Sequence, residues 1–210
     1  MSEVQLTIDG VAVSVPEGAT ILEACRADGK DQPTLCYLET LTPVNTCRVC
    51  VVQVAGSRTL VPSCSRVAED GMDISTDSPA VRQTRKVVLE FLASSVDLSL
   101  VNDQTRQWMD DYEVDPSRYG PAASDSPAGA RDARHPGHHA PPVEGLTETV
   151  GQPVKIDNPL YVRDYGKCIL CYKCVEACGP DAQNLSLIHI SEPTRRRLES
   201  RVAASGWTGG

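Results

Sequence analysis

Residues 36–64 read CYLETLTPVNTCRVCVVQVAGSRTLVPSC, in which four cysteines are separated by ten, two and thirteen residues. Cys47 and Cys50 form a C-x-x-C pair, whose spacing lets one short loop direct two sulfurs at one metal centre. Cys36 and Cys64 follow Thr-Leu and Pro-Ser, which are typical of loops. Plant-type [2Fe–2S] proteins take three thiolates from one loop and a fourth from further downstream. The stretch therefore predicts a variant [2Fe–2S] site formed by Cys36, Cys47, Cys50 and Cys64, with a first gap longer than the plant pattern has.

Other roles for these cysteines are weighed against a cluster. Structural zinc also takes four thiolates, usually as two C-x-x-C knuckles, and this stretch has one knuckle. A disulfide framework is typical of short secreted chains, whereas the opening MSEVQLTIDG has neither the basic nor the apolar part of a signal peptide. Cys25 lies in an apolar helical segment and is predicted to be a core residue. Zinc and inert thiols remain the alternatives.

Length and composition limit the classes of function. The chain has 210 residues, nine cysteines and a formal net charge of −8. That charge argues against nucleic acid as a partner, and no apolar run approaches the length of a membrane helix. Many cysteines without a secretion signal favour a reducing compartment. We therefore expect a cytoplasmic protein of one or two domains with no direct membrane insertion.

The order of the predicted elements indicates an α+β fold. Asp9-Gly10 separates two alternating runs and predicts a hairpin. Thr20 and Glu23 have capping-box spacing, which predicts a helix to about Asp28. Strands are expected over residues 49–54, 59–61 and 72–74. A hairpin, one helix and further strands make a β-grasp domain, assigned to residues 1–78, with the metal loop at one end.

Residues 79–113 are predicted to form a helical extension. Ser78 and Pro79 read as the N-cap and first position of a helix that runs to about Ser94. The apolar stripe expected to face the core is Val81, Thr84, Val88, Phe91 and Leu92. Asn102 or Asp103 can cap a second short helix, in which Trp108, Met109 and Tyr112 are interpreted as packing residues.

Residues 114–157 are interpreted as a linker, because eight of the fifteen prolines fall between Pro116 and Pro159. The three histidines of this segment are expected to be solvated rather than metal-bound: His135, His138 and His139.

A second cysteine run, YGKCILCYKCVEACGP, is spaced as in the bacterial [4Fe–4S] pattern. Its four candidate ligands are Cys168, Cys171, Cys174 and Cys178. In two-cluster ferredoxins the fourth cysteine of such a run binds the other cluster, so a complete domain needs a second run. Cys178 is the last cysteine of the chain. Residues 158–184 are therefore predicted to be a partial ferredoxin-like domain with an incomplete [4Fe–4S] site.

Both cysteine segments resemble a known family. Residues 33–65 with VRQTRKVVLEFLASSVDLS are similar to the N-terminal iron–sulfur region shared by the complex I 75-kDa subunit, NAD-reducing hydrogenase diaphorases and NAD-dependent formate dehydrogenases. DNPLYVRDYGKCILCYKCVEACGPDAQN is most similar to the formate dehydrogenase alpha and hydrogenase diaphorase branches. The resemblance covers about residues 3–100 and 156–184. It implies a β-grasp [2Fe–2S] domain, a [4Fe–4S] domain, and partners that include a flavin/NAD(H) module and a catalytic subunit.

The sequence departs from that family in two places. Much of the family has a one-His, three-Cys [4Fe–4S] site after the long helix, whereas residues 95–100 read SVDLSL, so that cluster is expected to be absent. LSLIHISEPTR, at Leu185–Arg195, resembles a translated sequencing adapter. We therefore interpret residues 185–210 as a non-native tail on a truncated chain.

These observations predict an electron carrier without a catalytic site of its own. The backbone amides of residues 46–49 are candidate donors to the cluster sulfurs. Arg48 is interpreted either as offsetting the cluster's negative charge or as a solvated surface residue. The chain has no G-x-G-x-x-G motif for a dinucleotide. Two alternatives remain: a structural zinc or scaffold module of such a complex, and the N-terminal fragment of a catalytic formate dehydrogenase alpha subunit.

Overall fold

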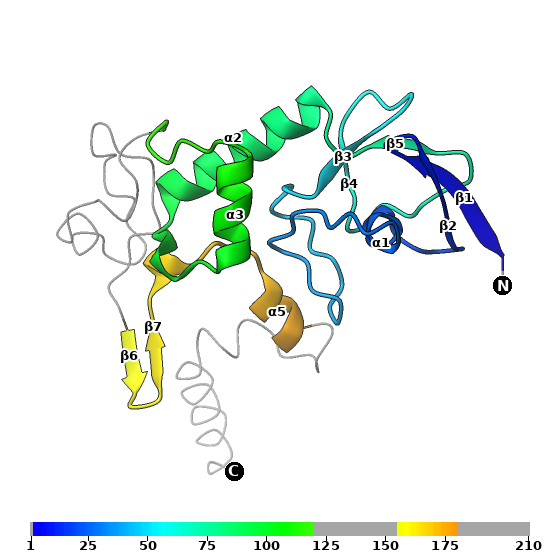
Figure 1. Ribbon diagram of the computed structural model, residues 1–210. Helices are drawn as coiled ribbons and strands as arrows, with labels where there is room; N and C mark the ends of the chain where they lie inside the picture. Colours follow the sequence, from blue (N-terminus) through cyan, green and yellow to red (C-terminus); the bar gives the residue numbers. More distant parts are fainter. Residues whose placement is uncertain (1, 120–154, 180–210) are drawn as a thin grey trace, which may run out of the picture. The chain divides into compact units, whose positions relative to one another are not determined.

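The computed structural model describes residues 2–119 and 155–179 (Figure 1). The chain divides into two units, one of residues 1–35 and 45–171 and the other of residues 36–44 and 172–210. The predicted solvated histidines and the residues of the predicted tail lie outside the described residues. No helix in the described part of the chain combines the length and the apolar character needed to cross a membrane.

A five-stranded mixed sheet organises the first unit, with strand order β2-β1-β5-β3-β4. The strands are β1 (Glu3–Ile8), β2 (Val11–Pro16), β3 (Val51–Val54), β4 (Val61–Pro62) and β5 (Asp73–Ser75). β1 runs antiparallel to β2 and parallel to β5, and β5 and β4 each run antiparallel to β3. The predicted strands are therefore confirmed, although the last three have shifted ends. This arrangement agrees with a ferredoxin-type domain.

The predicted hairpin and the first helix are both confirmed in detail. Asp9 and Gly10 have φ angles of 50° and 81°, the positive values that the tightest hairpin turn requires at both central positions. Helix α1 (Ile21–Ala27) begins at Thr20, whose Oγ1 accepts from the Glu23 amide at 3.2 Å. Glu23 in return accepts from the Thr20 amide at 2.6 Å. Local sequence signals therefore suffice for this part of the fold.

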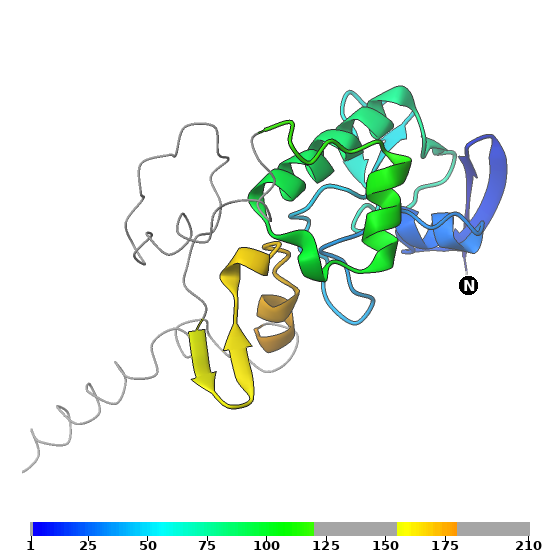
Figure 2. The same ribbon diagram turned by 60° about the vertical axis from the view of Figure 1, so that its left-hand side comes forward.

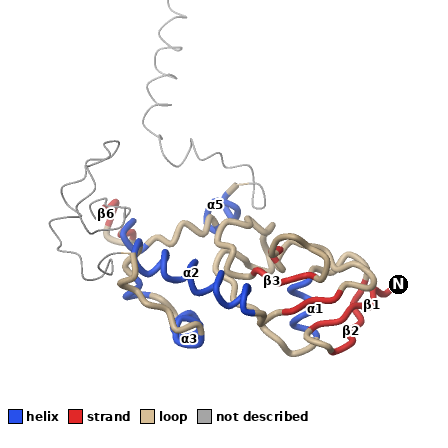
Figure 3. The backbone as a smooth tube through the Cα atoms, turned by 90° about the horizontal axis from the view of Figure 1, so that it is seen from above, coloured by secondary structure: helices blue, strands red, loops and turns tan. Residues whose placement is uncertain are grey.

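Helix α1 lies against the sheet and closes the main hydrophobic core (Figure 3). The buried members of this core are Leu6, Ile8, Val13, Val15, Ile21, Ala24, Cys25, Val52, Ala68 and Ile74. Burial raises the pKa of the Cys25 thiol to about 11. Cys25 is thus an inert core residue, as predicted.

Helix α2 (Pro79–Ser95) begins where predicted, with Ser78 Oγ accepting from the Val81 amide at 3.4 Å. Its predicted inner face is partly wrong. Phe91 is 50% exposed and stacks on Tyr119 with ring centroids 4.2 Å apart. Val81 is buried as predicted, and Val88 and Leu92 are partly buried. The other buried side chains of the helix lie outside the predicted stripe: Arg85, Leu89, Glu90, Ala93 and Ser94. Apolar periodicity missed this face because two of its buried residues, Arg85 and Glu90, are charged.

A second hydrophobic cluster joins α2 to the following elements. Helix α3 (Asp103–Asp111) runs across α2 (Figure 2) and is capped by Asn102, whose Oδ1 accepts from the Thr105 amide at 2.9 Å. The cluster is built on Leu35, Val49 and Leu89, with Trp108 and Met109 packed against it. The interpretation of these α3 residues as packing residues is confirmed.

The second cysteine run is reached through elements that the sequence did not predict. β6 (Lys155–Asn158) and β7 (Tyr161–Arg163) form an antiparallel hairpin with an irregular register. A short 3-10 helix, η3 (Tyr165–Lys167), follows, and Lys167 Nζ lies 3.0 Å from Asp97 Oδ2, just before the 3-10 helix η1 (Leu98–Leu100). Helix α5 (Lys173–Cys178) belongs to the second unit.

Candidate metal centre

The pairing of β3 with β4 brings two of the predicted ligands together. Val51 opposes Pro62 in the antiparallel register, so Cys50, just before β3, and Cys64, just after β4, lie at the same end of the strand pair. Their Sγ atoms are 3.5 Å apart. Ser63 fixes this arrangement, because its amide and its hydroxyl both donate to the Cys50 carbonyl, at 3.2 and 2.8 Å. Both cysteines are almost fully buried.

This sulfur pair fits a shared metal. Two thiolates on one tetrahedral ion, with bonds of about 2.3 Å, lie roughly 3.8 Å apart. The observed 3.5 Å separation therefore needs only a small adjustment. Thiolates are the ligands that iron–sulfur clusters and zinc prefer, so the donor set fits either of these.

The loop before β3 turns twice in the left-handed region. Asn45 and Arg48 have φ angles of 61° and 59°, which are uncommon for residues with a side chain and mark constrained turns. Cys47, between them, is half-buried and packs on the second hydrophobic cluster. Arg48 is exposed. Asn45 Oδ1 lies 2.7 Å from Ser65 Oγ and 3.5 Å from Cys64 Sγ.

The remaining predicted ligands are placed as follows. Cys36 is buried and belongs to the second unit. Within residues 2–119 and 155–179, no three His, Cys, Asp or Glu side chains are gathered as a metal site. The structure thus brings Cys50 and Cys64 into contact, and the full set of four stays a prediction.

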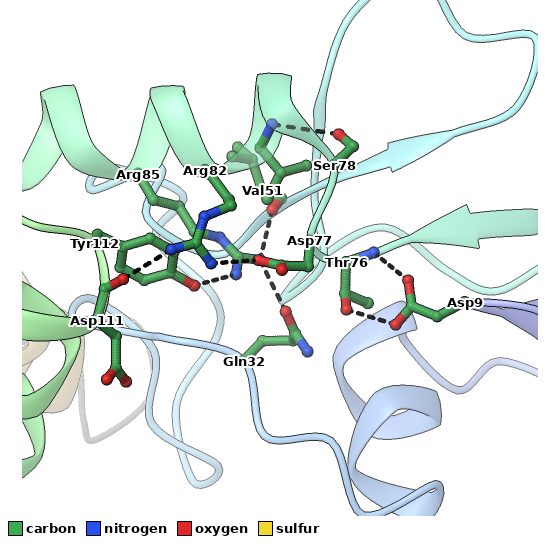
Figure 4. A network of polar contacts seen from close by, with 11 residues as sticks. Asp9, Gln32, Val51, Thr76, Asp77, Ser78, Arg82, Arg85, Asp111 and Tyr112 are labelled. Carbon is green, nitrogen blue, oxygen red and sulfur yellow. Dashed lines mark hydrogen bonds and ion pairs between the residues drawn. The ribbon is translucent and has the colours of Figure 1, made fainter.

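Arg85 is a buried cation next to the β3 cysteine, and the sequence interpretation missed it. It is 2% exposed. Its Nη2 donates to the Val51 carbonyl and to Gln32 Oε1, both at 2.8 Å, and its Nη1 donates to the Tyr112 hydroxyl at 2.6 Å (Figure 4). One side chain therefore fixes the backbone that follows Cys50, the segment after α1 and the end of α3. The available signal was an arginine midway between Val81 and Leu89, at the four-residue spacing of one helix face.

The second cysteine run is less buried. Cys168 and Cys171 are half-buried and belong to the first unit, whereas Cys174 is exposed and belongs to the second. Leu170 and Tyr172 have φ angles of 52° and 61°, so this segment, like the first cysteine loop, turns through the left-handed region. Cys178 is the last residue of α5.

A cavity of about 340 Å³ in the first unit connects the two cysteine segments. Cys47 and Cys171 both line it. Its walls are mainly apolar and come from Leu35, from α2 and from the segment before Cys171. A candidate ligand of each predicted cluster therefore lines the same cavity.

Comparison with known proteins identifies the first part of the chain. Residues 1–79 match the family described as "2Fe-2S iron-sulfur cluster binding domain". Residues 1–79 are therefore similar to a 2Fe-2S iron–sulfur cluster binding domain. The match contains the sheet, α1 and the cysteines of the first segment, so the predicted family and its [2Fe–2S] group are confirmed, and the zinc alternative is not favoured.

Relatives of the chain belong to large redox enzymes. One NADH-quinone oxidoreductase subunit from Rhizobium meliloti is 29% identical over 177 residues, which cover 83% of this chain and 18% of that protein. The NADH-ubiquinone oxidoreductase 75 kDa subunit of Reclinomonas americana is 44% identical over 89 residues, 42% of this chain and 13% of that protein. The NADP-reducing hydrogenase subunit HndD of Solidesulfovibrio fructosivorans is 50% identical over 99 residues, 45% of this chain and 17% of that protein. The chain thus spans less than a fifth of the length of these relatives.

A solved structure supports the fold. A chain of the NAD+-reducing [NiFe]-hydrogenase in the H2-reduced state matches with a TM-score of 0.59 over 84% of this chain and 66% of that one. The two are 22% identical, so this likeness concerns the fold alone.

Proposed function

We propose that the chain is the electron-carrying, N-terminal iron–sulfur part of a subunit of an NADH-quinone oxidoreductase or NAD-reducing hydrogenase type of complex. Cys36, Cys47, Cys50 and Cys64 hold a [2Fe–2S] cluster in this proposal. The observation that carries it is the 3.5 Å contact between the Cys50 and Cys64 sulfurs at one end of β3 and β4. The family of residues 1–79 supports the choice of iron over zinc.

The residues of the chain have three tasks in this function. The β3–β4 pair and Ser63 hold the ligand sulfurs at a fixed separation. The buried Arg85 keeps the backbone after Cys50 in place. Its positive charge favours the reduced state of the cluster, which is the more negative one. When bound, the cluster supplies a one-electron couple, near about −400 mV for plant-type centres. That potential suits exchange with a flavin/NAD(H) module.

A [4Fe–4S] group at Cys168, Cys171, Cys174 and Cys178 is the second part of the proposal. The spacing of the run and the cavity shared by Cys47 and Cys171 support it. Because the cavity is lined by one candidate ligand of each group, both groups border the same mainly apolar space. The partners at either end are a flavin/NAD(H)-binding subunit and a catalytic subunit of the complex.

Metal and sulfide analysis tests this function. The purified 210-residue chain, reconstituted with iron and sulfide under anaerobic conditions, is expected to contain acid-labile sulfide and to give a cluster EPR signal after reduction. Bound zinc with no visible colour and no sulfide would contradict the proposal and favour a structural module.

A further inference from the structure

We infer that the side-chain amide of Asn45 donates an N–H···S hydrogen bond to the Cys64 sulfur when that sulfur binds iron, and thereby raises the reduction potential of the centre. This inference rests on the proposed function. It concerns a side chain outside the cysteine set that touches a ligand atom directly.

Asn45 is held against Cys64 from two directions. Its backbone has a φ of 61°, which turns the chain so that the side chain points toward the β4 end. Ser65 Oγ then donates to Asn45 Oδ1 at 2.7 Å, and the Cys64 thiol donates to the same oxygen at 3.5 Å. Since the side chain is half-buried, the amide sits in a confined position between the two groups.

This arrangement suits a protonated thiol and does not suit a metal ligand. A cysteine that binds a metal does so as the thiolate, which has no proton to donate. The Asn45 side-chain oxygen, 3.5 Å from the Cys64 sulfur, would then face a thiolate of like charge, so this contact would become repulsive. Binding of iron therefore reverses the preference of this contact.

A half-turn of the amide resolves the conflict by exchanging the acceptor and the donor. An asparagine amide has an acceptor oxygen and an NH2 donor of nearly the same shape. After the half-turn, Nδ2 occupies the place of Oδ1, with one N–H directed at Cys64 and the other at Ser65. The Ser65 hydroxyl accepts as readily as it donates, so both contacts of Asn45 survive with reversed polarity.

The consequence is a change in reduction potential. Hydrogen bonds to cluster sulfurs are one of the factors that set the potential. Reduction adds negative charge to the centre, so a donor at Cys64 stabilises the reduced state more than the oxidised state. Asn45 is therefore a positioning and tuning residue, and it is not a ligand.

Two substitutions with matched backbone preferences test this role. Glycine and aspartate both tolerate the positive φ of Asn45, so neither Asn45→Gly nor Asn45→Asp requires the loop to change. Asn45→Gly removes the donor, and Asn45→Asp replaces it with an acceptor that carries a negative charge. In redox titrations of the reconstituted full chain we expect the midpoint potential to fall in N45G and to fall further in N45D.

Glu113→Gly is the matched control, because Glu113 is exposed and also has a positive φ, of 52°. Its midpoint potential is expected to equal that of the unmodified chain. A midpoint potential of N45G equal to that of the unmodified chain would overturn the inference. The absence of any cluster from the unmodified chain would instead contradict the proposed function itself.

A spectroscopic measurement on the unmodified chain makes the test independent of the variants. Pulsed EPR of the reduced centre, with asparagine labelled with ¹⁵N only in its side-chain amide, is expected to show a hyperfine coupling from that nitrogen. No coupling from labelled asparagine would overturn the inference even if both variants failed to assemble a cluster.

Discussion

The two cysteine segments of this chain are supported in different ways. In the first segment, Cys50 and Cys64 flank the paired strands β3 and β4 of a five-stranded sheet and are almost fully buried. The second segment follows a two-stranded hairpin whose apolar side chains are open to solvent, with Leu160 86% exposed and Ile156 75% exposed. An isolated two-stranded hairpin is marginally stable in water. The first segment therefore has a preformed frame for its sulfurs, and the second has little frame of its own.

This difference has a consequence for cluster binding. Where the frame preexists, binding adds to a fold that already places two sulfurs correctly. Where it does not, the free energy of binding has to order the segment as well. We therefore expect the N-terminal cluster to assemble more readily than the C-terminal one.

Removal of one ligand from each segment gives the largest expected effect. Cys64→Ser should abolish the [2Fe–2S] signal, because the thiolate contact with Cys50 is lost from a buried pair. Cys168→Ser should leave that signal intact. EPR and iron content of the two reconstituted variants check this comparison. Equal loss of signal in both variants would show that the two segments form one interdependent site.

The next largest difference between the two regions is expected in the stability lost when an apolar side chain is shortened. Leu89 is fully buried in the second hydrophobic cluster, so Leu89→Ala should lower the free energy of unfolding by about 2–5 kcal/mol. Leu160→Ala, at a largely exposed position, should change it by less than about 0.5 kcal/mol. Urea unfolding followed by circular dichroism measures both. A large loss in the Leu160 variant would mean that the hairpin is buried by something in solution.

Loss of a polar contact should also lower the free energy of unfolding more in the first region than in the second. Arg85→Met removes a buried guanidinium and leaves the Val51 carbonyl without this donor, so we expect a loss of about 2–3 kcal/mol of unfolding free energy. Lys167→Met removes a partly exposed ion pair with Asp97 and should cost less, about 1 kcal/mol or below.

Arg82→Met is the matched control on the same helix, since the Arg82 side chain is 46% exposed. Its expected loss is also below about 1 kcal/mol. If all three variants unfold at the same urea concentration, Arg85 does not act as the anchor described.

The smallest expected effect is a dependence on pH in the first region. Burial raises the pKa of the Asp9 carboxyl, but hydrogen bonds from the Thr76 hydroxyl and amide, at 2.7 and 2.8 Å, and the charge of Lys30 outweigh it, so the pKa lies below its usual value. A lowered folded-state pKa stabilises the fold above the unfolded-state pKa and loses that contribution as the pH falls through the folded value.

The unmodified chain should therefore lose stability on acidification from about pH 5 to 3, a window set by the usual carboxyl pKa near 4. Asp9→Asn, which tolerates the positive φ of the turn, should lose less over the same interval. Thermal unfolding at the two pH values gives this difference. An identical loss in both proteins would assign the acid sensitivity to other carboxylates.

Local signals predicted the fold better than long-range ones. The Asp9-Gly10 turn and the Thr20–Glu23 capping box were found because each depends on residues a few positions apart. Arg85 was missed because its partners lie 53, 34 and 27 residues away. Its burial follows from tertiary contacts that no residue-type average contains.

The cysteine site was predictable to a similar extent. Spacing indicated the C-x-x-C pair and the type of metal chemistry. The contact between Cys50 and Cys64 depends on the β3–β4 register, and the role of Asn45 depends on a backbone turn at an ordinary-looking residue. Chemistry was therefore readable from composition and spacing, whereas the groups that surround the sulfurs required the folded chain.

Native mass spectrometry of the reconstituted chain tests the central claim most directly. We predict a mass increase that corresponds to one [2Fe–2S] group in the unmodified chain and in Cys168→Ser, and no such increase in Cys50→Ser. Binding of a single zinc ion, or a [2Fe–2S] increment that survives Cys50→Ser, would contradict the account.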